Sequence, residues 1–348
     1  MRNFIILLNL LLAITACKTD DSSAKYDTSI TLNNVTDNII LTGYQELANN
    51  TSLLQGNIDV LKSNITEENL IIVQNNFLST YTTWQKISMF EFGPSVDEAL
   101  TSLNIYPTNI DRINDNILNG NYNLESASNI VSTGLPALDY LLFNDTKANI
   151  LIKLADLNYL NYLVAVTEQL ATKSNTVNNN WKNSYSATFK ASTAIDAGSS
   201  ISILANAFIL NFEKNGREAK IGIPAGVRTL NEAIPSNVES FYSGNSIALA
   251  KEQIAILKNI YEGNGSENYK AILTGLGKKA LADNISSDFI AIETSLNTLT
   301  DPFSDMLTAD NQTAISTYAE YQKLLPLLKV DMTAALGLLI TYSDSDGD

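Results

Sequence analysis

The sequence contains no histidine, and this absence restricts its chemistry more than any other feature. Ser-His-Asp and Cys-His nucleophilic systems use an imidazole as general base, so neither can be built from this chain. Zinc sites with histidine ligands, whether structural or catalytic, are excluded for the same reason. A metal ion would have to be held by carboxylate, carbonyl, tyrosine or water oxygens, which suit hard ions such as calcium, magnesium or ferric iron.

Cysteine and basic residues are also scarce. Cys17 is the sole cysteine, which excludes an internal disulfide framework. The chain has 22 Lys and Arg against 37 Asp and Glu, a formal net charge of −15. This balance argues against nucleic acid as a partner, because no basic patch is available to displace phosphate counterions. It fits a cationic ligand or a metal ion, and it equally fits an acidic surface that only maintains solubility.

The N-terminus has the features of an export signal. A positively charged start precedes an apolar run from Phe4 to Ile14, which is too short to cross a bilayer. Small residues follow, and Ile14-Thr15-Ala16-Cys17 resembles a bacterial lipobox, in which the cysteine is lipidated. We therefore predict a signal peptide over 1–16 and an outer-membrane lipoprotein of the cell envelope, periplasmic or surface-exposed, held by a lipid on Cys17. An ordinary secretory signal with a chance cysteine is the alternative.

The body of the chain is predicted to be all-α. Apolar residues recur at intervals of three or four, as in Leu70, Val73, Phe77, Tyr81 and Trp84, after the helix-start sequence Thr66-Glu67-Glu68. Strand patterns are sparse, and Pro326 should kink or end the last helix. The predicted organisation is a lipidated tether over 17–30, an N-terminal helical bundle over 31–185, a C-terminal helical bundle over 186–342 and an acidic tail over 343–348.

Three segments stand out from this helical background. The first runs from Trp84 to Phe90-Glu91-Phe92-Gly93-Pro94, and the second from Gly134 to Phe143. The third combines Lys220-Ile221-Gly222-Ile223-Pro224-Ala225-Gly226 with the stretch from Val238 to Ser246. In this order and spacing they resemble the imelysin family, envelope proteins that include an insulin-cleaving metalloproteinase and iron-regulated proteins. The resemblance covers nearly all of the predicted mature chain and implies two helical bundles packed face to face.

The motif of that family is Gly-x-His-x-x-Glu near the junction of the bundles, and this chain departs from it. The matching residues are Gly134, Pro136 and Asp139, so the histidine is replaced by a residue without a side-chain ligand. If the metal site of the family depends on the histidine, this protein has lost it or rebuilt it from oxygens. Pro136 fits a first helical turn, which Thr133 or Ser132 could cap. Asp139 would then lie near the positive end of the helix dipole, or else face a ligand.

The other candidate residues each have a structural alternative. Trp84 suits packing in a bundle or contact with a ligand. Glu91 lies between two phenylalanines and needs a partner, for which Arg112 or Lys220 are candidates. Ser243 and Ser246, which follow Glu239, could be helix caps or part of the second-half motif of the family. Lys220 could place backbone amides against an anion or against the other bundle. The predicted cleft residues are Trp84, Glu91, Tyr140, Lys220, Glu239, Ser240 and Ser243.

Three functions remain open. The first is a binding protein without enzymatic activity, in which Asp139, Glu239 and Glu91 hold iron or calcium, or a chelate of iron, for uptake through an envelope transport protein. The second is a metallopeptidase, which the missing motif histidine disfavours, since hydrolytic zinc normally has histidine ligands and a general-base glutamate. The third is a surface adaptor or accessory protein that has no metal site.

Overall fold

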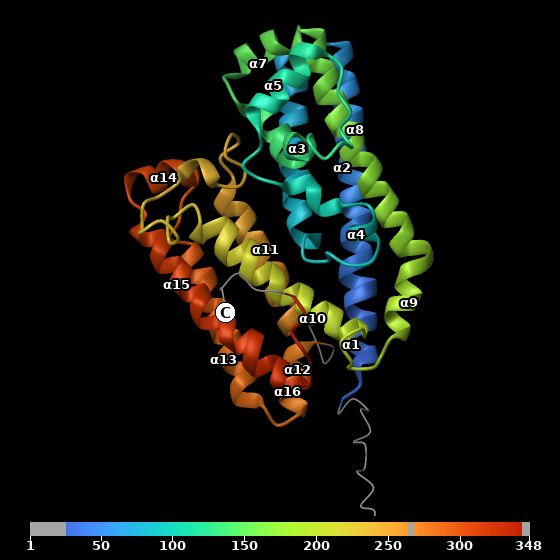
Figure 1. The fold of residues 1–348 in the computed structure, drawn as a ribbon, viewed down its shortest axis with the longest axis vertical. Helices are drawn as coiled ribbons and strands as arrows, with labels where there is room; N and C mark the ends of the chain where they lie inside the picture. Colours follow the sequence, from blue (N-terminus) through green and yellow to red (C-terminus); the bar gives the residue numbers. More distant parts are fainter. Residues whose placement is uncertain (1–25, 264–267, 343–348) are drawn as a thin grey trace, which may run out of the picture.

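The computed structural model describes residues 26–263 and 268–342, and most of this chain is helical. No β-strand occurs among the described residues, so the predicted all-α class is confirmed. The chain forms two groups of helices, which we call the N-terminal half (α1 to α9) and the C-terminal half (α10 to α16). Figure 1 shows the halves side by side, with α3 of the first next to α11 of the second.

In the N-terminal half, η1 and η4 are wider π-helical segments, and η2 and η3 are 3-10 turns. In chain order the segments are α1 (Thr28–Asn34), η1 (Val35–Ile40), α2 (Leu41–Ser63), α3 (Glu67–Ile87), α4 (Pro94–Asp97), η2 (Leu100–Asn104), α5 (Ile110–Asn119), η3 (Ile130–Ser132), α6 (Gly134–Phe143), α7 (Lys147–Leu154), α8 (Leu157–Asn180), η4 (Trp181–Tyr185) and α9 (Ser186–Ala191). In the C-terminal half, η5 and η7 are π-helical, and η6 is a 3-10 turn. The segments of this half are α10 (Ser200–Leu210), η5 (Asn211–Gly222), η6 (Pro235–Asn237), α11 (Ser246–Glu262), α12 (Tyr269–Gly275), α13 (Lys279–Leu296), α14 (Phe303–Ala309), α15 (Gln312–Pro326), η7 (Leu327–Met332) and α16 (Thr333–Leu336).

The helices of each half pack mainly among themselves, α3 packs against α11 between the halves, and the buried apolar residues of both halves form one cluster. In the N-terminal half α2 packs against α3 and α8, whereas in the C-terminal half α13 packs against α15 and α11, and η5 against α15. Helix α3 shows how the sequence directs this packing. Thr66 accepts a hydrogen bond from the backbone N–H of Asn69 and so caps the helix start, and the apolar stripe from Leu70 to Trp84 is buried.

One helix is longer than the sequence indicates. The charged stretch from Glu213 to Gly216 predicts a helix end, but π-helical turns continue to Gly222. The prediction was wrong because these charges are neutralised inside the fold. Buried Arg217 lies 2.8 Å from Glu218 and 3.6 Å from Glu213, and Lys329 lies 3.1 Å from Glu213. Pro326 acts as predicted, since α15 ends there and the chain continues as η7.

Two of the predicted boundaries fall within helical segments, and the division into two bundles stays a prediction. A continuous helical run from Leu157 to Ala191 includes the predicted bundle boundary at 185/186, and 28–30 of the predicted tether belong to α1. The signal peptide, Cys17 and the acidic tail lie outside the described residues. Within the described ranges, no single helix has both the length and the apolar character to cross a membrane. One pair, Lys147–Leu154 with Leu157–Ala191, meets these criteria by length and composition but is bent by 97°.

Candidate functional site

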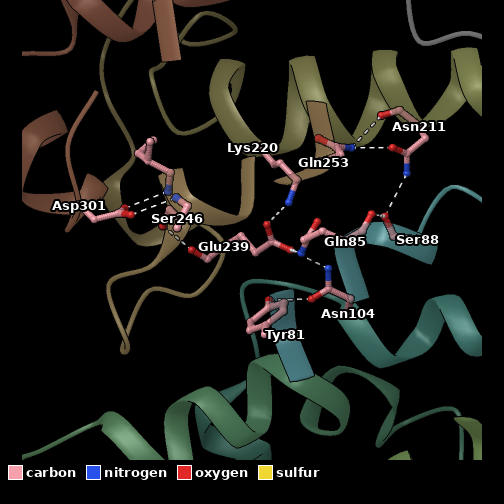
Figure 2. A network of polar contacts seen from close by, with 12 residues as sticks. Tyr81, Gln85, Ser88, Asn104, Asn211, Lys220, Glu239, Ser246, Gln253 and Asp301 are labelled. Atoms are coloured by element: carbon pink, nitrogen blue, oxygen red, sulfur yellow. Dashed lines mark hydrogen bonds and ion pairs between the residues drawn. The ribbon is translucent and has the colours of Figure 1, made fainter. Parts of the chain in front are cut away.

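A buried carboxylate, that of Glu239, lies at the centre of the contact between the halves. Its side chain is 1% exposed and forms an ion pair with Lys220, which lies in η5. From the N-terminal half, Gln85 of α3 and Asn104 of η2 donate hydrogen bonds to Glu239 Oε1, at 3.0 and 2.8 Å. Tyr81 donates in turn to Asn104 Oδ1 at 2.7 Å, as Figure 2 shows. We call these five residues the junction network.

Burial of the junction network shifts the pKa values of two of its side chains. Lys220 is 4% exposed, and burial lowers its pKa below the ordinary value although Glu239 opposes the shift. Burial also raises the pKa of Tyr81 well above its ordinary value, an effect that Glu239 and Asp139 strengthen.

A cavity of about 220 Å³, which we call the junction cavity, opens beside this network. Both halves contribute to its wall, with α3 and the Asn104–Tyr106 segment on one side and η5, Glu239 and α11 on the other. Its lining residues are Trp84, Gln85, Ser88, Glu91, Asn104, Ile105, Tyr106, Asn215, Ala219, Lys220, Glu239 and Gln253. Four of the predicted cleft residues, Trp84, Glu91, Lys220 and Glu239, are therefore brought together here.

Of the two acidic groups in the wall of this cavity, Glu91 is the one without a cationic partner among the described residues. It is half-buried, and burial raises its pKa, while a hydrogen bond with Asn215 partly offsets the shift. Neither predicted partner fulfils that role, because Lys220 is paired with Glu239 and Arg112 is exposed on α5. Among the described residues, no Lys or Arg forms an ion pair with Glu91.

Asp139 of α6, the motif carboxylate, has a different environment. It is 2% exposed and accepts hydrogen bonds from the backbone N–H groups of Tyr242 at 2.9 Å and Ser243 at 3.1 Å. The side chain thus fastens the N-terminal half to the turn that precedes α11. Burial raises its pKa to about 6, although the hydrogen bonds from Tyr242 and Ser243 counteract the shift.

The Asp139 environment predicts a pH effect on stability. Since the folded pKa of about 6 exceeds the ordinary 3.8, the folded protein retains a proton that the unfolded chain has lost in this range. Wild type should therefore lose up to about 3 kcal/mol of stability relative to Asp139→Asn as pH rises from about 4 to about 6. Urea unfolding of both proteins across this window measures the difference. A difference that does not change with pH would contradict the prediction.

The start of α6 does not follow the predicted capping. Neither Thr133 nor Ser132 accepts a helix amide; their hydroxyls donate to the carbonyls of Ile130 and Asn129, at 3.1 and 2.8 Å. Both hydroxyls are therefore used by the preceding turn η3, and Gly134 begins the helix with a left-handed φ of +71°. Pro136 lies in the first turn, as predicted.

The serine residues before α11 are not helix caps either. Ser246 donates its hydroxyl to the backbone carbonyl of Glu239, and the hydroxyls of Ser240 and Ser243 contact each other. Asp301 caps α11 instead, by accepting the amides of Ile247 at 2.9 Å and Ala248 at 3.1 Å. The cap comes from 54 residues away in sequence, so the local pattern could not indicate it.

The remaining predicted residues lie at a second, smaller cavity or near it. This cavity of about 110 Å³ is lined by Pro136, Asp139 and Ser240, among others, and it shares Tyr106 with the junction cavity. The rings of Tyr140 and Tyr242 pack edge to face, with centroids 5.1 Å apart. It lines neither cavity.

The three carboxylates predicted as metal ligands have separate partners. Glu239 is engaged by Lys220, Asp139 by two backbone amides and Glu91 by Asn215. Within residues 26–263 and 268–342, no group of three or more Asp, Glu, His or Cys side chains is placed to hold an ion. Residues that sequence reasoning missed at this site are neutral, namely Gln85, Asn104, Tyr106, Asn215 and Gln253, and Tyr81 was predicted only as part of the apolar stripe of α3. No local pattern in the sequence marks them as site residues.

Comparisons with known proteins agree with this architecture. A crystal structure of an imelysin-like protein from Psychrobacter arcticum 273-4 is 18% identical and has a TM-score of 0.72, with 90% of this chain and 97% of that chain covered. An iron-regulated protein A precursor from Parabacteroides distasonis ATCC 8503 is 16% identical, with a TM-score of 0.69 and coverage of 88% and 95%. The search of curated proteins gives no match. The family model described as Imelysin, which bears a peptidase name, matches residues 40–329, and the chain therefore belongs to the imelysin family.

Proposed function

We propose that this protein is a non-enzymatic lipoprotein of the cell envelope, anchored at the outer membrane, that binds iron as a small complex in the junction cavity and passes it to a transport protein. The observation that carries the proposal is the cavity itself, which both halves build and in which Glu91 has no cationic partner within the part of the chain that the structure describes. The resemblance to an iron-regulated protein A precursor supports a link to iron. The export signal at the N-terminus supports the envelope.

The geometry favours an iron complex over a bare ion. A ferric ion in a protein site needs several oxygen ligands, whereas the cavity offers one carboxylate, that of Glu91, without a cationic partner among the described residues. The complex must therefore bring most of its own oxygens. Lys220 also lines the cavity and forms an ion pair with Glu239. A free cation that bound Glu239 would compete with the positive charge of Lys220, so this pair disfavours a free cation. In the proposed complex, Glu91 supplies a single oxygen to the metal.

A peptidase function is less well supported, although the family bears a peptidase name. A hydrolytic zinc normally takes histidine ligands with a glutamate as general base, and this chain has no histidine. The position of the motif histidine is held by Pro136, which has no ligand atom in its side chain. Chelator-sensitive cleavage of a peptide by the pure protein would reverse this assignment.

Calorimetric titration with ferric nitrilotriacetate, ferric citrate and calcium tests the proposal. We expect both ferric complexes to bind, and Glu91→Gln to weaken that binding about tenfold or more, because the variant loses a charged oxygen at the metal. Glu46→Gln is the matched control, since Glu46 lies on α2 in an ion pair with Lys86 and does not line the cavity. The absence of heat with every ferric complex would overturn the proposal and favour an adaptor protein without a ligand.

A further inference from the structure

The smaller cavity of about 110 Å³ has a largely aromatic wall. Tyr106, Phe241 and Tyr242 all line it, and the rings of Phe241 and Tyr242 lie 5.0 Å apart at 85° to each other. Phe241 is 38% exposed, and the other two are partly exposed, so these aromatic residues are not sealed inside the core. Because the faces of aromatic rings carry a negative electrostatic potential, a wall of this kind favours a cation.

A buried negative charge lies at the same cavity. Asp139 lines it, and its pKa of about 6 leaves the carboxylate ionised at neutral pH. None of the described Lys or Arg residues forms an ion pair with Asp139, whose hydrogen bonds at 2.9 and 3.1 Å come from neutral backbone amides. Burial, together with the charges of Tyr140 and Asp139, raises the pKa of Tyr242 to about 12, so the field of Asp139 reaches the aromatic wall. A cation in the cavity would compensate this buried charge.

The hydroxyl and carboxylate groups that line the cavity are mostly engaged within the protein. The Ser240 hydroxyl contacts that of Ser243, and the Thr108 hydroxyl donates to the carbonyl of Val131 at 3.1 Å. Each oxygen of Asp139 already accepts an amide. A hard metal ion needs several oxygen ligands, and a primary ammonium group has three N–H donors to satisfy. A methylated ammonium group has no N–H to satisfy, and it is the cation that aromatic walls recognise best.

The size of the cavity agrees with such a group. At about 30 Å³ for each water molecule in the liquid, 110 Å³ corresponds to roughly four waters. A trimethylammonium group, with one nitrogen and three methyl carbons, occupies a similar space. The cavity therefore accommodates the charged end of a small molecule, whereas the rest of that molecule would lie outside it.

We infer that the smaller cavity binds a methylated ammonium group such as that of choline, with its three aromatic residues around the charge and Asp139 as the counter-ion. The acidic balance of the chain, with a net charge of −15, favours the approach of such a ligand. This site does not depend on iron binding in the junction cavity, although Tyr106 lines both cavities.

Calorimetric titration of the full chain compares choline with dimethylbutanol, which has the same shape without the charge. We expect choline to bind at least tenfold more tightly than dimethylbutanol and at least threefold more tightly than ethanolamine, whose ammonium group is primary. Glycerophosphocholine, which carries the phosphate of a lipid headgroup, identifies the source. Tighter binding than choline indicates a lipid headgroup, and weaker binding indicates a free solute; either result supports the site. Equal binding of choline and dimethylbutanol would overturn the inference.

Two variants test the residues. Asp139→Asn should weaken choline binding at least tenfold and leave dimethylbutanol unaffected, because only the charge is removed. Phe241→Leu, which keeps an apolar side chain but loses the ring, should weaken choline binding about threefold or more. Phe143→Leu is the matched control, since that ring packs against Phe77 and lines neither cavity.

Far-UV circular dichroism of each variant verifies its fold. If Asp139→Asn does not fold, Phe241→Leu decides the question, because this partly exposed side chain is replaced at little cost to stability. A choline affinity in Phe241→Leu equal to that of Phe143→Leu would overturn the inference. The proposed iron function would stand in that case, since its test uses Glu91 and ferric complexes.

Discussion

Replacing Lys220 by methionine is expected to lower the free energy of unfolding by about 3–5 kcal/mol. The variant removes the only cation that faces Glu239 within the described junction network, and the carboxylate remains 1% exposed. Gln85 and Asn104 still donate to one oxygen, but two neutral amides do not replace a full charge. Equilibrium unfolding in urea, followed by far-UV circular dichroism, measures the loss.

Two further variants show whether the loss of stability comes from leaving the buried Glu239 charge unpaired or from removing any lysine. Lys220→Met combined with Glu239→Gln should recover at least half of the lost stability, because the remaining side chain is neutral and keeps its hydrogen bonds. Lys323→Met breaks an exposed pair with Glu320 at 2.8 Å and should cost less than about 1 kcal/mol. If Lys220→Met cost no more than Lys323→Met, Glu239 could not be a buried charge that depends on its partner.

Gly134→Ala is expected to destabilise the fold by about 2–5 kcal/mol. The residue has a φ of +71°, which costs an alanine about 1–2 kcal/mol. An added Cβ would also overlap the backbone carbonyl of Leu103, and relief of such overpacking costs about 1–3 kcal/mol. Because the contact is with backbone, η2 or α6 would have to move. Thermal and urea unfolding provide the measurement.

Gly56→Ala is the matched control for this substitution. Gly56 lies inside α2, and an added Cβ there meets nothing within 4 Å. The same chemical change should therefore stabilise the protein by about 0.5–1 kcal/mol through helix propensity. Similar destabilisation in both variants would mean that the tight approach of Leu103 to Gly134 does not constrain the fold.

The fold could be predicted largely from the sequence because its signals are local. The stripe from Leu70 to Trp84 and the cap at Thr66 define α3, and Pro326 ends α15 where its missing N–H requires. The charged stretch at 213–216 gave a wrong helix end for the opposite reason. Its neutralising partner Lys329 is 116 residues away, so nothing nearby in sequence indicates that these charges are buried.

The site could be predicted only in part for the same physical reason. Trp84, Glu91, Lys220 and Glu239 come together as expected, but Gln85 and Asn104 reach Glu239 across 154 and 135 residues. Neutral amides carry no pattern that distinguishes a buried donor from a surface residue. The partner of Lys220 was likewise undetermined by sequence, because Glu91 and Glu239 are both acids without a nearby base.

The junction network also determines how the polypeptide can be divided. A fragment that ends near Ala191 would expose Gln85, Asn104 and the indole of Trp84, and one that begins near Ser200 would present Lys220 and Glu239 to water. Neither piece can satisfy these groups alone, and the apolar cluster, which includes residues of both halves, would be divided as well. Separately produced fragments should therefore associate spontaneously when mixed, because each supplies polar partners and apolar surface that the other lacks.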